Sequence, residues 1–266
     1  MFYLLHPAMP DRYGGLTDEI AEFKAIHGEY QTGSNLAEIP AGSIVIPRYR
    51  MLPFGRELEQ EVASLGSRLI NTFRQHRHIA DLMNWVPLLE GLTAPVYQQH
   101  EVPYLPEGEW FVKGETNSIK NRWFECCYAP TTKDLPTVVR NNMLDVYVGS
   151  QPIYIRPFQH YRQVATAVDG RPVFNERRVF VYEGKVISEG NYWVSQMEEE
   201  VSPLDESKMW ATINEAVDRT SDLADFYVID VAEYPDGTWS VVELNDGSMS
   251  GLSANDPHTV WSGMKK

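Results

Sequence analysis

The chain has 266 residues, of which 43% are hydrophobic and 12% aromatic, so it can bury a substantial core and is not a disordered protein. It carries 23 Lys and Arg against 37 Asp and Glu, a net charge of −14, which argues against a nucleic acid or an anionic membrane as its partner because both need basic surfaces. The two cysteines are adjacent and make no disulfide framework, no apolar run approaches the ~20 residues of a membrane span, and the start lacks the features of a signal peptide, so we expect a cytoplasmic protein.

Strands and helices alternate in the N-terminal part. The segments MFYLLHP and SIVIPRY are short apolar runs typical of buried strands. Apolar side chains recur at near-helical spacing from Gly55 to Phe73, which predicts one helix there, and a second helical stretch is predicted from His78 to Leu89. Prolines and glycines between Gly91 and Glu109 then indicate a boundary, so we expect a small N-terminal α/β domain over residues 1–95.

Beyond residue 95 short β segments dominate the pattern. Glu109–Gly114 is predicted as a strand that ends beside a lysine, and a polar loop, Glu115–Arg122, follows it. The turn sequences Glu183-Gly184 and Pro235-Asp-Gly237 predict two hairpins. The other predicted elements are a helix at Asp205–Arg219 and strands at Asp145–Gly149, Pro152–Arg156, Gln163–Val168, Arg177–Tyr182, Lys185–Trp193, Phe226–Tyr234 and Thr238–Asn245. This pattern is α+β, with mostly antiparallel strands.

The second of these hairpins carries the clearest group of polar residues. Asp230 interrupts one apolar strand, and Glu243 and Asn245 lie at the end of the next. Period-two alternation places Glu243 and Asn245 on one face, and a turn at Asp236-Gly237 pairs Asp230 with Glu243. Three oxygen donors with two formal charges suit Mg²⁺ bound together with substrate phosphates. The alternative is an ordinary solvent-facing polar surface.

Cationic residues precede this hairpin. The stretch from Glu101 to Lys185 holds eleven Lys and Arg against ten Asp and Glu, in an otherwise acidic chain. Lys113 ends a strand, Lys120 lies on the polar loop, and Arg178 alternates with Glu176 along a strand. Several such cations are needed to hold a triphosphate, because lysine offers a point charge and arginine a planar fork. Each cation taken alone is equally compatible with an ordinary surface charge.

Other catalytic constellations find little support in the sequence. Cys126 and Cys127 lack the C-x-x-C spacing of a zinc site, so we interpret them as core residues, and His76 and His78 as residues of a helix end. The chain contains no Walker A sequence and no Gly-x-Gly-x-x-Gly fingerprint.

In chain order, the segments FVKGETNSIK, PIYIRPF, NERRVFVYEGKVISEGNYW and FYVIDVAEYPDGTWSVVELNDGSMSGL resemble those of the ATP-grasp superfamily. The resemblance covers residues 95–252 and is nearest to the compact, largely uncharacterised ATP-grasp families of phages and bacteria. It implies an ATP-grasp fold, in which two α+β subdomains grip ATP. We expect this domain over residues 96–266, with subdomains of about 96–155 and 156–266, preceded by the small α/β domain.

The resemblance also implies roles for individual residues. Lys113 would hold the α- and β-phosphates, and Lys120 would lie on the loop that covers the phosphates. Arg178 would contact the γ-phosphate or an acyl-phosphate, so Arg178 and Lys120 are the expected catalytic residues. The remaining expected residues are the adenine-contacting hinge around Ile153, Tyr154, Ile155 and Arg156, and the ligands of two Mg²⁺ ions, Asp230, Glu243 and Asn245.

The implied activity is an ATP- and Mg²⁺-dependent ligase that joins a carboxylate to an amine through an acyl-phosphate, with a small molecule or a peptide as substrate. Such chemistry needs no Ser, Cys or His nucleophile, and positioning with charge neutralisation does most of the work. The alternatives are a non-catalytic protein that binds a nucleotide or a partner on the same scaffold, and a kinase that stops at phosphoryl transfer. Arg156, Arg162 and Arg177 are further candidates for holding the carboxylate donor.

Overall fold

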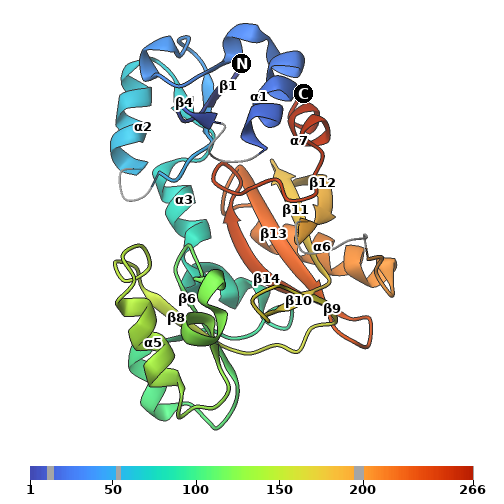
Figure 1. The fold of residues 1–266 in the computed structure, drawn as a ribbon. Coiled ribbons are helices and arrows are strands. Elements are labelled where there is room, and N and C mark those ends of the chain that lie inside the picture. The colour runs from blue at the N-terminus through green and yellow to red at the C-terminus, as the bar shows by residue number, and fades with distance from the viewer. Residues whose placement is uncertain (11–14, 52–54, 195–200, 266) are drawn as a thin grey trace.

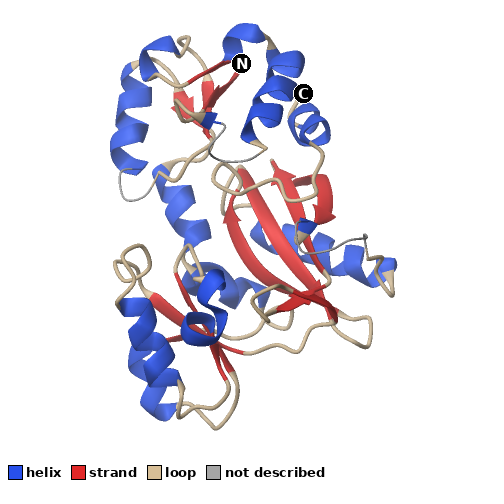
Figure 2. Cartoon of the chain, in the orientation of Figure 1, coloured by secondary structure: helices blue, strands red, loops and turns tan. Residues whose placement is uncertain are grey.

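A computed structural model describes residues 1–10, 15–51, 55–194 and 201–265 (Figure 1). Over these residues the chain forms three four-stranded sheets and one two-stranded sheet, with helices packed around them, so the predicted α+β class is confirmed. Figure 2 shows the long strands of one sheet between the N-terminal unit at the top and a smaller sheet at the bottom. No helix of the described residues is long and apolar enough to cross a membrane; the cytoplasmic location stays a prediction.

The N-terminal unit is built on a parallel sheet of order β2-β1-β3-β4. The two predicted strands are confirmed as β1 (Phe2–Leu5) and β3 (Ile44–Pro47), whose side chains are mostly buried. The remaining elements of this unit are β2 (Thr32–Gly33), β4 (Arg68–Leu69), α1 (Leu16–His27) and α2 (Gly55–Ser64).

The single helix predicted from Gly55 to Phe73 is wrong. α2 ends at Ser64, and Gly66 then adopts a left-handed φ of 71°, which reverses the chain and lets Leu69 enter the sheet as part of β4. A new helix, α3 (Phe73–Ala80), begins after Thr72, whose side chain forms a capping box with Gln75.

The second predicted helix, His78–Leu89, is divided in the structure. α3 ends at Ala80, and Asp81 adopts an extended conformation while its side chain accepts a hydrogen bond from the Met83 amide and so caps α4 (Leu82–Trp85). A 3₁₀ turn, Val86–Leu89, follows with Pro87 in its first turn.

The smaller antiparallel sheet has the order β5-β8-β6-β7. Its strands are β5 (Tyr97–Gln98), β6 (Trp110–Gly114), β7 (Tyr128–Ala129) and β8 (Ile153–Pro157), and α5 (Leu135–Met143) packs against it. The strand predicted at Asp145–Gly149 is wrong, because the Asp145 carboxylate accepts hydrogen bonds from the amides of Tyr147 and Val148 and folds this segment into turns.

The larger antiparallel sheet has the order β12-β11-β13-β14 and contains both predicted hairpins. Its strands are β11 (Glu176–Tyr182), β12 (Lys185–Asn191), β13 (Phe226–Glu233) and β14 (Trp239–Asp246), and a small hairpin joins β9 (Gln163–Thr166) to β10 (Pro172–Phe174). α6 (Glu206–Thr220) confirms the predicted helix and is capped by Asp205.

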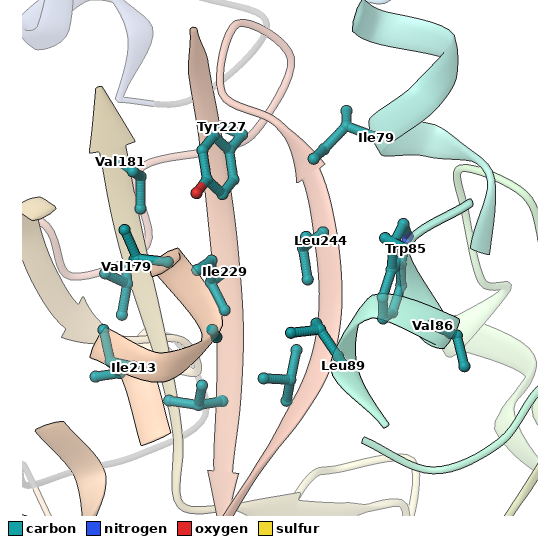
Figure 3. Close-up of a cluster of buried hydrophobic side chains, with 14 of the residues drawn as sticks. Ile79, Trp85, Val86, Leu89, Val179, Val181, Ile213, Tyr227, Ile229 and Leu244 are labelled. Atoms are coloured by element: carbon teal, nitrogen blue, oxygen red, sulfur yellow. The ribbon is translucent and has the colours of Figure 1, made fainter. Parts of the chain in front are cut away.

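One face of this sheet buries its apolar side chains against two separate parts of the chain. Figure 3 shows Val179, Ile229 and Leu244 on the strands, with Ile213 of α6 on one side and Trp85 and Leu89 on the other. Because these side chains are buried, the positions that alternate with them along the strands project to the opposite face.

The last helix, α7 (Pro257–Gly263), returns to the N-terminal unit and packs against α1. The rings of Trp261 and Phe23 meet edge to face, with 5.3 Å between their centroids. The same hydrophobic cluster includes Leu4 of β1 and Phe226 of β13, so it joins the beginning and the end of the described chain in one core. The boundary expected at residues 95 and 96 stays a prediction.

Candidate active site

Three charged residues lie side by side across the larger sheet. In the register of the strands, Asp230 pairs with Arg178 of β11 on one side and with Glu243 of β14 on the other, as the hairpin predicted. Leu244 is buried in the core on the opposite face, so Glu243 and Asn245 share the face that carries Arg178. The regular alternation of the strands therefore builds this group.

Arg178 and Asp230 form a buried, bidentate ion pair. Arg178 donates from Nε and Nη2 to the two carboxylate oxygens of Asp230, at 2.9 and 2.7 Å, and from Nη1 to the Gly251 carbonyl at 2.9 Å. Asp230 has no exposed surface, and its burial raises its pKa although Arg178 acts in the opposite direction. The pair fixes the guanidinium plane at the edge of a cavity.

Lys113 and Glu243 form a second pair between the two sheets. The Lys113 Nζ donates to Glu243 Oε2 at 2.6 Å, and Asn245 Nδ2 donates to Glu243 Oε1. Burial raises the pKa of Glu243, but Lys113, Lys120 and these hydrogen bonds outweigh it and lower the pKa to about 2. Glu243 is therefore a carboxylate at neutral pH.

Lys120 reaches the same place from the loop after β6, where it begins a 3₁₀ turn. Its Nζ donates to the Tyr192 hydroxyl at 2.9 Å and lies 4.5 and 4.8 Å from the ring centroids of Tyr192 and Trp193. Burial lowers the pKa of Lys120, but Tyr192, Glu176 and Glu243 raise it above its ordinary value, so the side chain stays charged.

Two adjoining cavities meet at Lys120 and Glu243, which line both of them. The first, which we call the aromatic cavity, is lined by rings that include Phe111, Phe158 and Phe174. The second, the polar cavity, has a volume of about 280 Å³ and lies among Thr116–Ser118, Arg178 and Asn245. An apolar, ring-lined cavity beside a charged one suits a ligand with a planar ring and an attached polyanion.

Comparison with known proteins gives this geometry a family. Residues 99–264, more than half of the chain, match a family model for the ATP-grasp domain, the third family of its clade. The chain belongs to the ATP-grasp superfamily. Among the curated proteins compared with the chain by sequence, none matches.

Solved structures give the same fold over nearly the whole chain. D-cycloserine synthetase DcsG aligns with a TM-score of 0.63 at 10% identity, covering 99% of this chain and 97% of that one. D-alanine–D-alanine ligase from Bacillus anthracis aligns with a TM-score of 0.64 at 12% identity, covering 98% and 93%. The ATP-grasp ligase PsnB, complexed with minimal precursor, Mg and ADP, aligns with a TM-score of 0.53 at 14% identity, covering 93% and 90%. These likenesses confirm the ATP-grasp fold predicted from the sequence.

Within the ATP-grasp fold, the structure brings together most of the residues that the sequence predicted for the site. Lys113, Lys120 and Glu243 line the aromatic cavity, and Arg178 and Asn245 line the polar cavity. Asp230 lies beneath Arg178 and lines neither cavity. The oxygen donors of Asp230, Glu243 and Asn245 are of the kind that Mg²⁺ prefers, and their strand register keeps them adjacent, so the residues fit this ion. No group of three or more His, Cys, Asp or Glu side chains converges as a metal cluster within the part of the chain that the structure describes.

The structure does not bring Ile153, Tyr154 and Ile155 to the aromatic cavity. Tyr154 and Ile155 are hydrogen-bonded in the sheet between β5 and β6, and the three side chains are buried. Of the predicted hinge, Arg156 alone lines the cavity, and its guanidinium donates to the carbonyls of Val242 and Ala94 and to a threonine hydroxyl. The chain that leaves the end of β8, Pro157–Gln159, lines the cavity instead.

The arginines considered for a carboxylate substrate are also engaged within the protein. Arg162 pairs with Glu233 at 2.5 Å and donates to the Ser202 carbonyl, and Arg177 pairs with Glu189 at 3.2 Å and donates to the Val201 carbonyl. These interactions leave the three arginines, Arg156 included, holding loops and strands in place.

Sequence reasoning missed two acidic or basic groups at the cavities. Glu176, at the start of β11, lines the aromatic cavity and accepts a hydrogen bond from Trp193 Nε1 at 2.8 Å, and burial raises its pKa to about 7. His76 of α3 lines the polar cavity, and its Nδ1 lies 3.0 Å from the Asp246 carboxylate. Alternation with Arg178 pointed to the side of the strand on which Glu176 lies, but nothing in the sequence placed α3 beside the hairpin.

Proposed function

We propose that the protein is an ATP- and Mg²⁺-dependent ligase that joins a carboxylate to an amine through an acyl-phosphate. The observation that carries the proposal is the pair of neutralised contacts, Lys113 with Glu243 and Arg178 with Asp230, at a polar cavity that adjoins an aromatic one. Each contact joins a residue suited to phosphate with a residue suited to Mg²⁺, and both kinds are needed where MgATP binds.

In this proposal the aromatic cavity takes the adenine ring, and the backbone of Pro157–Gln159 contacts its polar edge. Lys113 and Lys120 hold the phosphates, and Arg178 faces the phosphoryl group that is transferred. Asp230, Glu243 and Asn245 hold Mg²⁺, which when bound neutralises the charge that develops on the transferred group. Arg178 stays in the same plane during transfer because Asp230 and the Gly251 carbonyl fix it.

The substrates bind in a third cavity, of about 1040 Å³, between the N-terminal unit and the loop that follows β14. This cavity shares Met249 and Gly251 with the polar cavity, so a group bound in it can approach the phosphates. Arg48 holds the loop in position, because it pairs with Glu19 at 2.7 Å and donates to the Gly247 carbonyl at 3.0 Å.

A thiol intermediate is a poorer explanation of the site. Cys126 and Cys127 are both buried and free, and burial raises the pKa of Cys127 to about 12, which suppresses the thiolate. Neither cysteine lines either of the two cavities proposed for ATP. An amine that attacks an acyl-phosphate needs no such nucleophile.

Calorimetric titration with ATP, with and without Mg²⁺, tests the binding part of this proposal. Wild-type protein should bind tightly only when Mg²⁺ is present, and Glu243→Ala should abolish this binding. Glu57→Ala is the control, since Glu57 is an exposed carboxylate on α2, away from the cavities. Equal binding by wild type and Glu243→Ala would contradict the proposed site.

An ADP-release screen over carboxylates, amino acids, peptides and polyamines tests the reaction. Hydroxylamine in the assay traps an acyl-phosphate as a hydroxamate, so ligation chemistry gives a hydroxamate together with ADP. A product that retains a stable phosphoryl group would identify a kinase. MgATP binding without turnover over the whole panel would favour a non-catalytic nucleotide-binding protein.

A further inference from the structure

The helix α3 contacts both walls of the polar cavity with adjacent residues. His76 Nδ1 lies 3.0 Å from Asp246 Oδ2, at the end of β14, and Arg77 Nη1 donates to Glu115 Oε2 at 2.6 Å, at the start of the loop after β6. Figure 1 shows α3 between the N-terminal unit and the sheet that contains β6 and β8. Successive helical residues point about 100° apart, so neighbours in sequence can reach opposite walls.

The contact with the hairpin is buried and organises the loop that follows it. The side chains of His76 and Asp246 are each 1% exposed. The other oxygen of Asp246 accepts a hydrogen bond from the Ser248 amide at 2.8 Å, and its backbone carbonyl accepts one from the Ser250 hydroxyl. His76 therefore supports the segment whose Gly251 carbonyl receives Arg178.

The contact with the other wall ends at a buried carboxylate. Glu115 is 3% exposed, whereas Arg77 is 38% exposed and reaches it from the side of the solvent. Glu115 directly precedes Thr116–Ser118, which line the polar cavity, and its amide donates to the Pro152 carbonyl at 3.0 Å. The position of this loop is thus fixed partly by its own sheet and partly by α3.

Two further contacts make α3 a fixed reference for both walls. Before the helix, the Asn71 side chain exchanges two hydrogen bonds with the backbone of Phe226, at 2.6 and 2.9 Å. After it, the Asp81 carboxylate accepts a hydrogen bond from the Tyr154 hydroxyl at 2.5 Å. The segment from Asn71 to Asp81 therefore bonds to the larger sheet and to the smaller sheet.

We propose that His76 and Arg77 are positioning residues that set the separation between the loop Glu115–Ser118 and the end of β14, and so the width of the polar cavity. The Arg77–Glu115 contact is the adjustable half, because it is the partly exposed one. Its effect on nucleotide binding rests on the proposed function, whereas its effect on the loop does not.

Amide hydrogen exchange without nucleotide tests the contact itself. Arg77→Ala should speed exchange in the peptide that covers residues 114–119 on the order of tenfold, through the loss of a charge-assisted hydrogen bond. Exchange in β13 should not change, and Arg77→Lys should restore part of the protection. Arg74→Ala, an exposed arginine on the same helix, is the matched control.

Glu115→Gln should speed exchange in the same peptide, and the Arg77→Ala/Glu115→Gln double variant should add little to either single change, since both remove one contact. Unchanged exchange at residues 114–119, or an equal increase throughout the chain, would overturn the proposal.

Calorimetric titration with Mg²⁺ and ADP tests the effect on the cavity. Arg77→Ala should weaken Mg·ADP binding on the order of tenfold, from the same lost hydrogen bond, and Arg74→Ala should not. Equal affinity of Arg77→Ala and wild type would overturn the positioning role. If wild type itself fails to bind Mg·ADP, the proposed function fails, and the exchange experiment alone decides whether α3 sets the loop.

Discussion

The buried pair of Arg178 and Asp230 makes a strong prediction about stability. Arg178→Met keeps a long apolar side chain but leaves Asp230, which is fully buried, without its cation. Removing one partner of a buried ion pair costs about 3–5 kcal/mol, because the remaining charge is uncompensated. We expect a loss of this size in the free energy of unfolding at pH 7, measured by urea denaturation.

The loss should depend on pH in a definite direction. Burial already raises the pKa of Asp230, and without Arg178 it would rise further. A carboxyl group with a raised pKa in the folded state binds a proton there while the unfolded chain has released it. Stability therefore falls as the pH rises from the unfolded pKa towards the folded one, and it is regained as the pH falls. The cost of Arg178→Met should be smaller at pH 5 than at pH 7.

Two further variants make this reasoning refutable. Arg178→Met/Asp230→Asn removes the buried charge as well, so it should be more stable than Arg178→Met alone. Arg219→Met breaks the exposed pair with Glu215 and should cost less than about 1 kcal/mol. If Arg178→Met costs no more than Arg219→Met, or if the double variant is no more stable than the single one, the argument from burial is wrong.

Three other predictions follow from local geometry. Thr72→Ala removes the cap and capping box of α3 and should lower the free energy of unfolding by about 1 kcal/mol in urea denaturation. Gly190→Ala places a Cβ 2.8 Å from backbone atoms of Ala254 and Asn255, so it should cost about 1–3 kcal/mol in the same assay. Cys127 should react with Ellman's reagent at pH 8 only after unfolding, since burial raises its pKa to about 12.

Each of these three has its own check. An unchanged urea midpoint for Thr72→Ala would show that the cap does not hold α3. Gly251→Ala is the control for Gly190→Ala, because no atom lies within 4 Å of the added Cβ, and equal losses would exclude the clash as the cause. Rapid labelling of the folded protein would contradict the burial of both thiols.

The hairpin could be predicted from the sequence because its register is a local property. The turn at Pro235-Asp-Gly237 and the alternation of side chains pair Asp230 with Glu243, as the structure has them. That these carboxylates pair with Arg178 and Lys113 could not be predicted, because Lys113 lies on a different sheet, far away in the sequence.

The errors came from patterns that end without a local signal. Leu69 continues the helical spacing of the residues before it by coincidence, and the left-handed turn at Gly66 shows where that helix had stopped. The adenine-contacting segment was placed too early, because the apolar run of β8 does not reveal that its backbone is hydrogen-bonded within the sheet and that the chain becomes available only from Pro157.

The packing of α7 against α1 has a consequence for synthesis on the ribosome. The cluster that covers Leu4 and Phe23 is completed by Val260, Trp261 and Met264, close to the other end of the chain. The N-terminal strands emerge first, but an important part of the apolar surface that covers them is translated last. We therefore expect the N-terminal unit to stay incompletely folded on a nascent chain, and a fragment that stops before α7 to expose an apolar surface that favours aggregation.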